Sequence, residues 1–441
     1  MRLARSGERI AAETPPERDR YLDALRVLAV LFVVSGHWLV RVIVETGEGL
    51  QGAYLLNLRP DLQWATLLWQ VMPVFFFVGG AVNIASWRRA RAAGESASRW
   101  VCRRVHGLLT PALLLIAVLV PLAALVEGVA STQALVFDFG VAVFPMWFLA
   151  VYILVTALVP VTVSLHRCGR GWHLLLAGGA LAIVLDLLRF AGQGPTLGTQ
   201  PAVAAPNFLI VWVLVHQAGY YWADGALAGR GAALIGAGGM ALIAMIAVGP
   251  WPLSMVPFEG TARANNGAPP STALLALGAV QLGIAILLRE PVGRWLKRPL
   301  IWAPVALIGA HIMAVYLWHQ PAMVAVANLA VTSGWLVSGT ELDADWWAGR
   351  LGWVLACGAV LLPLAVVAAR VGNLWRPADS EPGDAITGLG VALVCGGLAG
   401  LIGVRLVQSG MPLNLPLVPL AAVLAGAAML GVFTRRAGRA G

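Results

Sequence analysis

The chain has 441 residues, of which 59% are hydrophobic and only 12% are charged. In soluble domains roughly a quarter of the residues are charged. This composition excludes an ordinary soluble enzyme and indicates a polytopic membrane protein. The formal net charge of +9 does not indicate a nucleic-acid partner, because the arginines lie in short loops where retention on the cytoplasmic side explains them. The four cysteines have no paired spacing, so neither a disulfide framework nor a zinc site is predicted.

Apolar segments long enough to cross a bilayer as helices follow one another along the chain, and about twelve such spans are predicted. Their bounds are 22–44, 64–86, 107–127, 145–165, 172–190, 206–223, 231–249, 272–289, 301–332, 349–370, 386–407 and 412–433. We therefore predict an all-α polytopic membrane protein.

Positive charge gives the orientation of the spans. Residues 1–20 and 87–106 are rich in arginine, whereas the alternate loops, such as 250–271, carry very few basic residues. Because Arg and Lys are retained on the cytoplasmic side, both termini are predicted to be cytoplasmic. An even number of spans follows from this arrangement.

The first span is interrupted by three ionisable residues, Asp23, Arg26 and His37. These residues and the lack of a small-residue cleavage site argue against a cleaved signal peptide. At about 100° per residue, Arg26 and His37 lie on one helix face, and Asp23 joins the same stripe. Ionisable groups within a bilayer face the bundle interior or a wet cavity, so the stripe is predicted to line a polar passage. The alternatives are that Arg26 extends to the cytoplasmic interface and that His37 only hydrogen-bonds a neighbouring helix.

The segment "YLDALRVLAVLFVVSGH" resembles the first helix of acyltransferase family 3, in which an arginine is followed, after ten residues, by a histidine. Arg26 and His37 match that pattern. Three further segments resemble the family in the right order: "MPVFFFVGGAVNIASW" (72–87), "FPMWFLAVYILVTALVPV" (144–161) and "GAHIMAVYLWHQPAMV" (309–324). The resemblance covers roughly residues 18–370 and implies an integral membrane O-acyltransferase.

The chain departs from the family pattern in two places. The family often has an arginine-x-x-arginine motif before the third span, whereas this chain has Arg103 and Arg104 followed by His106 and Gly107. The usual serine-tyrosine of the late segment is also replaced. The resemblance implies a core of ten helices, so about two C-terminal helices extend beyond the family domain. The predicted organisation is a disordered basic tail (1–17), the acyltransferase domain (18–370), a cytoplasmic linker (371–385), a transmembrane hairpin (386–435) and a basic tail (436–441).

Acyl transfer to a hydroxyl needs a base, and imidazole is the side chain best matched to neutral pH, so His37 is the predicted general base. Arg26, Arg103 and Arg104 are predicted to bind the phosphates of acyl-CoA through charge-assisted hydrogen bonds. For Arg103 and Arg104 the alternative is simple cytoplasmic retention. Asp23 is predicted to orient Arg26.

The late segment supplies the other candidates. His319 is predicted to hydrogen-bond the acceptor, or else to satisfy backbone groups freed by Pro321. Trp147 and Tyr316 are predicted to wall the passage, although a tryptophan near a span end is also a common interface anchor. His311, His216 and Asp186 lie nearer mid-membrane and are interpreted as helix-packing partners rather than catalysts.

We therefore predict a multi-pass plasma-membrane O-acyltransferase that moves an acyl group, expected to be acetyl, from cytoplasmic acyl-CoA to a hydroxyl of a carbohydrate, lipid or secondary metabolite. Acyl-CoA is a co-substrate. No permanently bound cofactor, metal or nucleic acid is expected, and the lipid bilayer is the surrounding partner. The alternative is a secondary transporter or flippase, but "LDALRVLAVLFVVSGH" has no counterpart in the second half of the chain, as an internal repeat would require.

Overall fold

The computed structural model describes the chain in stretches separated by short gaps. The described residues are 8–47, 49–130, 135–194, 196–197, 200–258, 260–261, 264–334, 343–375, 380–403 and 415–434. The predicted basic tail at 436–441, residues 1–7 of the N-terminal tail and residues 376–379 of the linker lie outside them.

The chain forms two compact units, each assembled from separate stretches. The first unit contains Met1–Val33, Leu56–Arg88 and Leu158–Ile312, and the second contains Val34–Leu55, Arg89–Ala157 and Met313–Gly441. Helix α2 (Arg20–Val40) belongs to both, because the division falls between Val33 and Val34.

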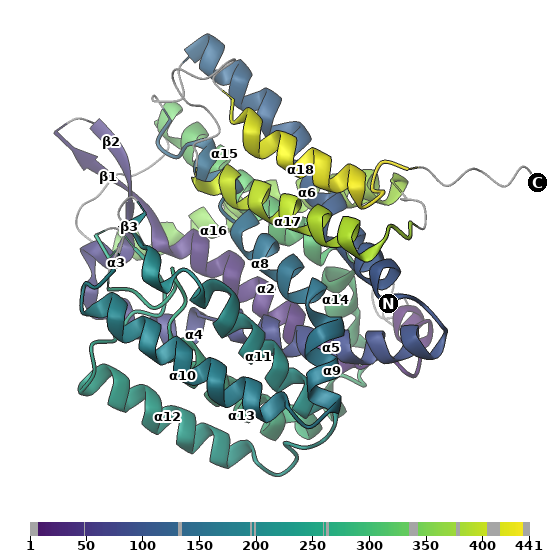
Figure 1. Cartoon of the computed structure of the whole chain (residues 1–441). Helices are drawn as coiled ribbons and strands as arrows, with labels where there is room; N and C mark the ends of the chain where they lie inside the picture. The colour runs from purple at the N-terminus through teal and green to yellow at the C-terminus, as the bar shows by residue number, and fades with distance from the viewer. Residues whose placement is uncertain are drawn as a thin grey trace, which may run out of the picture. The chain divides into compact units, whose positions relative to one another are not determined.

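The first unit is a helical bundle. Besides the start of α2 it contains η1 (Pro60–Ala65), α4 (Thr66–Trp69), most of α5 (Met72–Ala92), α9 (Val159–Arg167), α10 (Gly171–Phe190), β3 (Thr196–Leu197), β4 (Gln200–Pro201), η3 (Ala202–Ala204), α11 (Asn207–Ala223), α12 (Gly231–Ala247), α13 (Thr272–Trp295) and α14 (Pro299–Ala310). Helices α12 and α13 lie side by side, as do α10 and α11 (Figure 1). A methyl group on Gly219 of α11 would collide with the carbonyl oxygen of Phe77 in α5. The glycine therefore permits the close approach of these two helices.

The second unit combines helices with one β-hairpin. Its elements after α2 are β1 (Arg41–Thr46), β2 (Gly49–Tyr54), α6 (Ala97–Ala130), α7 (Phe139–Val143), α8 (Met146–Ala157), α15 (Ile312–Thr332), α16 (Ala344–Leu374), α17 (Asp384–Gly403) and α18 (Leu417–Met429), while the short α3 (Leu55–Leu58) begins in this unit. Helices α17 and α18 form a pair, and α17 also packs on α8 and α6 (Figure 1). The C-terminal hairpin is thus packed against helices of the second unit.

In the described part of the chain, ten helical segments are long and apolar enough to cross a membrane. They are Arg20–Val40, Pro60–Ala92, Ala97–Glu127, Phe139–Ala157, Gly171–Phe190, Ala202–Ala223, Thr272–Trp295, Ile312–Thr332, Ala344–Leu374 and Asp384–Gly403. Three shorter apolar helices are Gly231–Ala247, Pro299–Ala310 and Leu417–Met429. The mostly helical, polytopic class is confirmed, while the number of about twelve spans and the cytoplasmic position of both termini stay predictions.

The first span ends earlier than predicted. Residues 41–44 form part of strand β1 rather than helix, and β1 pairs antiparallel with β2 so that Arg41 lies opposite Tyr54. The run Val42, Ile43 and Val44 consists of β-branched residues, which favour a strand over a helix. The hairpin extends from the end of α2 (Figure 1).

The predicted span 301–332 is two helices, because α14 ends before His311 and α15 begins after it. The backbone N–H of His311 donates to the carbonyl of Ile308 at 3.0 Å, and its ring Nδ1 donates to the carbonyl of Leu307 at 2.9 Å. These bonds close α14 in a tight final turn. The predicted span 145–165 is also interrupted, between α8 and α9, where Pro160 occupies the first turn of α9.

The N-terminal tail is not disordered throughout, in contrast to the prediction. Residues 8–12 are helical. The indole Nε1 of Trp302 donates to the hydroxyl of Thr14 at 2.7 Å, and Arg20 Nη2 donates to the carbonyl of Ala11 at 3.1 Å. These two bonds fix the tail to helices of the first unit.

A surface cluster of the first unit predicts a pH dependence of stability. Arg88 donates to both carboxylate oxygens of Asp224, at 2.5 and 3.0 Å, and His166 Nε2 lies 3.0 Å from Oδ2. The hydrogen bond from Arg88 lowers the pKa of Asp224 below its usual 3.8, and the hydrogen bond from His166 lowers it by a smaller amount. A folded-state pKa below the unfolded value stabilises the fold above about pH 4, and this stabilisation is lost as the pH falls through the folded-state pKa.

We expect the unfolding temperature in detergent to fall more steeply below about pH 4 for the wild type than for Asp224→Asn, which has no carboxylate to protonate. Heating series at several pH values between about 3 and 6 measure this difference. Parallel profiles for the two proteins would contradict the expectation.

Candidate active site

Two histidines far apart in the sequence meet in the second unit. His37 lies near the end of α2 and His319 lies in α15, and His37 Nδ1 is 2.8 Å from His319 Nε2. The two ring planes are within 4° of parallel, with centroids 5.1 Å apart, so the contact lies nearly in both ring planes. His319 is fully buried and His37 is half-buried. We call this pair the histidine dyad.

The partners of the dyad determine which nitrogens carry protons. His319 Nδ1 lies 2.5 Å from the carbonyl oxygen of Tyr316, which can only accept, so Nδ1 of His319 donates. In a neutral imidazole the other nitrogen is then the acceptor, and His37 Nδ1 must donate to His319 Nε2. Neutral His37 consequently has its lone pair on Nε2. No hydrogen bond joins this atom to the described residues, so it is the nitrogen available to an external hydroxyl.

Tyr316 contributes to the dyad through its backbone more than through its hydroxyl. Its ring centroid is 5.9 Å from that of His319, and its hydroxyl donates to the carbonyl of Pro145 at 2.8 Å. The hydroxyl proton is thus engaged with the protein. Tyr316 is placed beside the dyad, as the prediction of a wall residue requires, but its role stays a prediction.

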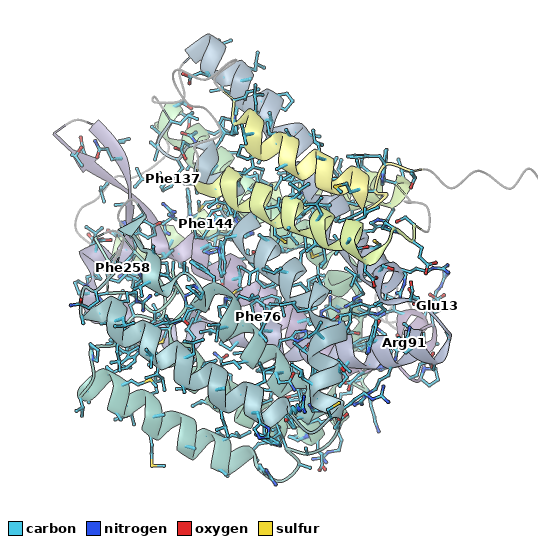
Figure 2. The ribbon with its side chains drawn as sticks, in the orientation of Figure 1. Glu13, Phe76, Arg91, Phe137, Phe144 and Phe258 are labelled. Carbon is cyan, nitrogen blue, oxygen red and sulfur yellow. The ribbon has the colours of Figure 1, made fainter. Side chains whose placement is uncertain are left out.

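One aromatic ring from the α7–α8 region contacts the dyad directly. The ring of Phe144, labelled in Figure 2, meets the ring of His37 edge-on with centroids 6.1 Å apart. Trp147 is half-buried, and its ring packs against Phe148, whose ring in turn packs against Tyr316. In this chain of contacts Trp147 is separated from the dyad by two aromatic side chains.

The end of α2, directly after His37, is held by residues that the sequence analysis missed. Arg350 Nη2 donates to the carbonyls of Trp38, Leu39 and Arg41 at 2.5, 3.1 and 2.7 Å. An arginine at the predicted outer end of a span was the available signal, because it departs from the cytoplasmic placement of positive charge.

Arg26 and Asp23 lie in the part of α2 that belongs to the first unit. Arg26 Nη1 is 3.6 Å from Asp23 Oδ1, whereas Arg18 Nε lies 2.6 Å from Asp23 Oδ2. Asp23 therefore interacts with Arg26 but binds Arg18 more closely. The side chain of Arg26 is 40% exposed. The predicted roles of both residues stay predictions.

The predicted donor-binding arginines of the second unit are not equivalent. Arg103 binds Glu95 with two parallel bonds of 3.0 and 2.9 Å, while the guanidinium of Arg104 lies 5.9 Å from the ring centroid of Trp100. His106, one of the two residues at which the second arginine of the family motif would fall, donates through Nε2 to the carbonyl of Leu430 at 2.7 Å. This side chain thus binds the backbone directly after α18.

No group of three His, Cys, Asp or Glu side chains in the described residues is arranged to hold a metal ion.

Comparison with known proteins identifies the family of the chain. A family model described as an acyltransferase domain matches residues 19–370. The chain belongs to acyltransferase family 3. The resemblance predicted from four segments is confirmed, and the protein is a multi-pass membrane acyltransferase. No curated protein and no solved structure matches the sequence.

Proposed function

We propose that this acyltransferase moves an acyl group, in the first instance acetyl, from cytoplasmic acyl-CoA to a hydroxyl of a carbohydrate, lipid or secondary metabolite at the plasma membrane. The observation that carries the proposal is the histidine dyad, in which neutral His37 presents an unprotonated Nε2. A base positioned in this way is what acyl transfer to a hydroxyl needs, because the proton must leave as the new bond forms.

In the proposed reaction, His37 Nε2 accepts the proton of the acceptor hydroxyl while its oxygen attacks the thioester carbonyl carbon. A C–O bond forms and the C–S bond breaks. The imidazolium of His37 then gives the proton to the departing thiolate, so that free CoA and the O-acyl product are released. During the step, the positive charge on His37 is stabilised by His319 Nε2, which accepts from Nδ1 at 2.8 Å.

Donor binding is proposed to rest on Arg26 more than on Arg103. The phosphates of CoA suit guanidinium groups, which form charge-assisted hydrogen bonds. Glu95 already occupies the Nε and Nη2 donors of Arg103, so a phosphate would have to compete with a carboxylate. The side chain of Arg26 is 40% exposed, and its nearest carboxylate oxygen, Asp23 Oδ1, is 3.6 Å away.

The test is acetyl-CoA binding by calorimetry together with CoA release over time, in detergent, for the wild type, Arg26→Gln and His37→Gln. Loss of one charge-assisted bond is worth about 1.5–3 kcal/mol, so Arg26→Gln is expected to weaken binding by about ten-fold or more. Arg59→Gln, at an exposed arginine paired with Asp61, is the control for the same change of charge.

If the monodisperse wild type binds no short acyl-CoA, the proposed donor is wrong. Uptake measurements in vesicles would then test the transporter alternative. Equal weakening by Arg26→Gln and Arg59→Gln would instead remove Arg26 from the donor site.

A further inference from the structure

The last carbonyl groups of α2 are bound by the side chain of an arginine from another helix. A helix leaves its final C=O groups without intrahelical partners, and inside a membrane no water is present to satisfy them. Nη2 of Arg350, in α16, donates to two carbonyls of this helix end, those of Trp38 and Leu39, and to the carbonyl of Arg41 at the start of β1. Only 8% of Arg350 is exposed. The contact therefore lies inside the protein, one residue beyond His37.

Two tryptophans extend this contact to the histidine dyad. Trp353 Nε1 also donates to the carbonyl of Trp38, at 2.9 Å. Trp38 Nε1 in turn donates to the backbone carbonyl of His319 at 3.0 Å. The backbone of Trp38, next to His37, is thus held by α16. The side chain of Trp38 is bound to the backbone of His319.

The guanidinium of Arg350 is accommodated by backbone and aromatic rings. In the described part of the second unit, no carboxylate lies within salt-bridge distance of it. Its carbon Cζ lies 5.1 Å from the ring centroid of Trp346 and 5.4 Å from that of Trp353. The negative end of the α2 dipole and these π faces favour the cation. Its contacts are therefore suited to fixing backbone rather than to pairing with an acid.

We infer that Arg350 is a positioning residue that holds the end of α2 so that His37 Nδ1 stays bonded to His319. The 2.8 Å bond of the dyad would be broken by a displacement of about 1 Å, because hydrogen bonds weaken beyond about 3.2 Å. Without that bond, neutral His37 can carry its proton on Nε2, and that nitrogen can then no longer accept a proton from the acceptor hydroxyl. The catalytic consequence rests on the proposed function, whereas the effect on the dyad does not.

The kinetic test compares Arg350→Gln, Arg350→Lys and Arg189→Gln. Arg189 is the control for losing a buried arginine that binds backbone: it is buried, binds the carbonyls of Asn265 and Pro269 in the first unit, and differs from Arg350 in also pairing with Asp186. A displacement of about 1 Å at a reacting group lowers rates by about 10²-fold. We expect Arg350→Gln to lower kcat by about that factor, with the KM for acyl-CoA changed less than about three-fold, and Arg350→Lys to recover part of the loss.

Adding Arg350→Gln to His37→Gln is expected to cause no further loss, because the first residue acts through the second. A full additional loss in the double variant would overturn the inference. The inference would also be overturned if Arg350→Gln and Arg189→Gln, both monodisperse, lowered kcat equally.

A second readout needs no acyl transfer. Diethyl pyrocarbonate modifies accessible unprotonated imidazole nitrogens, and peptide mass spectrometry locates each adduct. The wild type and Arg350→Lys are expected to carry one adduct on His37 and none on His319, whereas Arg350→Gln should carry adducts on both. An unchanged pattern in Arg350→Gln overturns the inference. If the pattern changes as expected but no variant transfers acyl groups, the positioning of the dyad stands and the proposed reaction fails.

Discussion

Replacing His37 with glutamine is expected to lower kcat for acyl transfer by about 10²- to 10⁴-fold, the contribution usual for a positioned general base. Acyl-CoA affinity should stay within about two-fold, because the donor is proposed to be held by arginines and not by the imidazole. Glutamine has a similar volume, and its amide can still donate to His319 Nε2. The substitution therefore removes the basic nitrogen while preserving much of the contact.

The measurement is kcat and KM for CoA release with acceptor present, together with calorimetric affinity for acetyl-CoA. His173→Gln, at an exposed histidine of α10 in the first unit, is the matched control and should retain activity. Activity above about a tenth of the wild type in His37→Gln would exclude general-base catalysis by this residue, since that role contributes at least about 10²-fold. A large rise in the acetyl-CoA dissociation constant would place His37 in donor binding instead.

Much of the helical framework could be predicted from the sequence, because spans are set by the length of apolar runs and by the bilayer thickness. The interruptions were harder. Hydropathy treats 301–332 as continuous, and only the bonds of His311 with the preceding turn show that α14 ends there. The strand after α2 was missed for a similar reason, since Val42 to Val44 are as apolar as the helix they follow.

The candidate site was predictable in its members but not in its contacts. Helical periodicity and the arginine-histidine spacing singled out His37, and the late-segment pattern singled out His319. Each was given a separate role, because neither hydropathy nor periodicity states which helices are neighbours. The dyad and its proton arrangement depend on a contact across 282 residues of sequence. Arg350 was missed because it lies at a span boundary, where hydropathy analysis gives charged residues little weight.

The second large effect is expected for stability, at the buried ion pair of the first unit. Asp186 and Arg189 are both fully buried in α10, with Asp186 Oδ1 3.5 Å from Arg189 Nη2. The other carboxylate oxygen has neutral partners: Asp186 Oδ2 accepts from the backbone N–H and hydroxyl of Thr272 at 2.7 and 2.8 Å and from Trp251 at 3.2 Å. The interpretation of Asp186 as a helix-packing partner is consistent with these contacts.

Asp186→Ala is expected to lower the free energy of unfolding by about 3–5 kcal/mol, because removing one partner leaves a buried guanidinium without its counter-charge. Asp61→Ala breaks an exposed ion pair with Arg59 in the same unit and should change the free energy of unfolding by less than about 1 kcal/mol. Heating series followed by size-exclusion chromatography in detergent give the temperature at which half of each protein stays monodisperse. Equal temperatures for the two variants would show that the buried pair contributes no more than a surface pair.

Asp186→Asn separates the charge from the hydrogen bonds. Thr272 is the first residue of α13, so its N–H is one of the donors that a helix start leaves unsatisfied, and Asp186 supplies the acceptor. Asparagine keeps one acceptor oxygen for Thr272, but its amino group would then face the donors of Arg189 and Asn207. Its unfolding temperature should therefore fall between those of the wild type and Asp186→Ala. A value equal to Asp186→Ala would assign the whole effect to the carboxylate charge, whereas a wild-type value would assign it to the bond with α13.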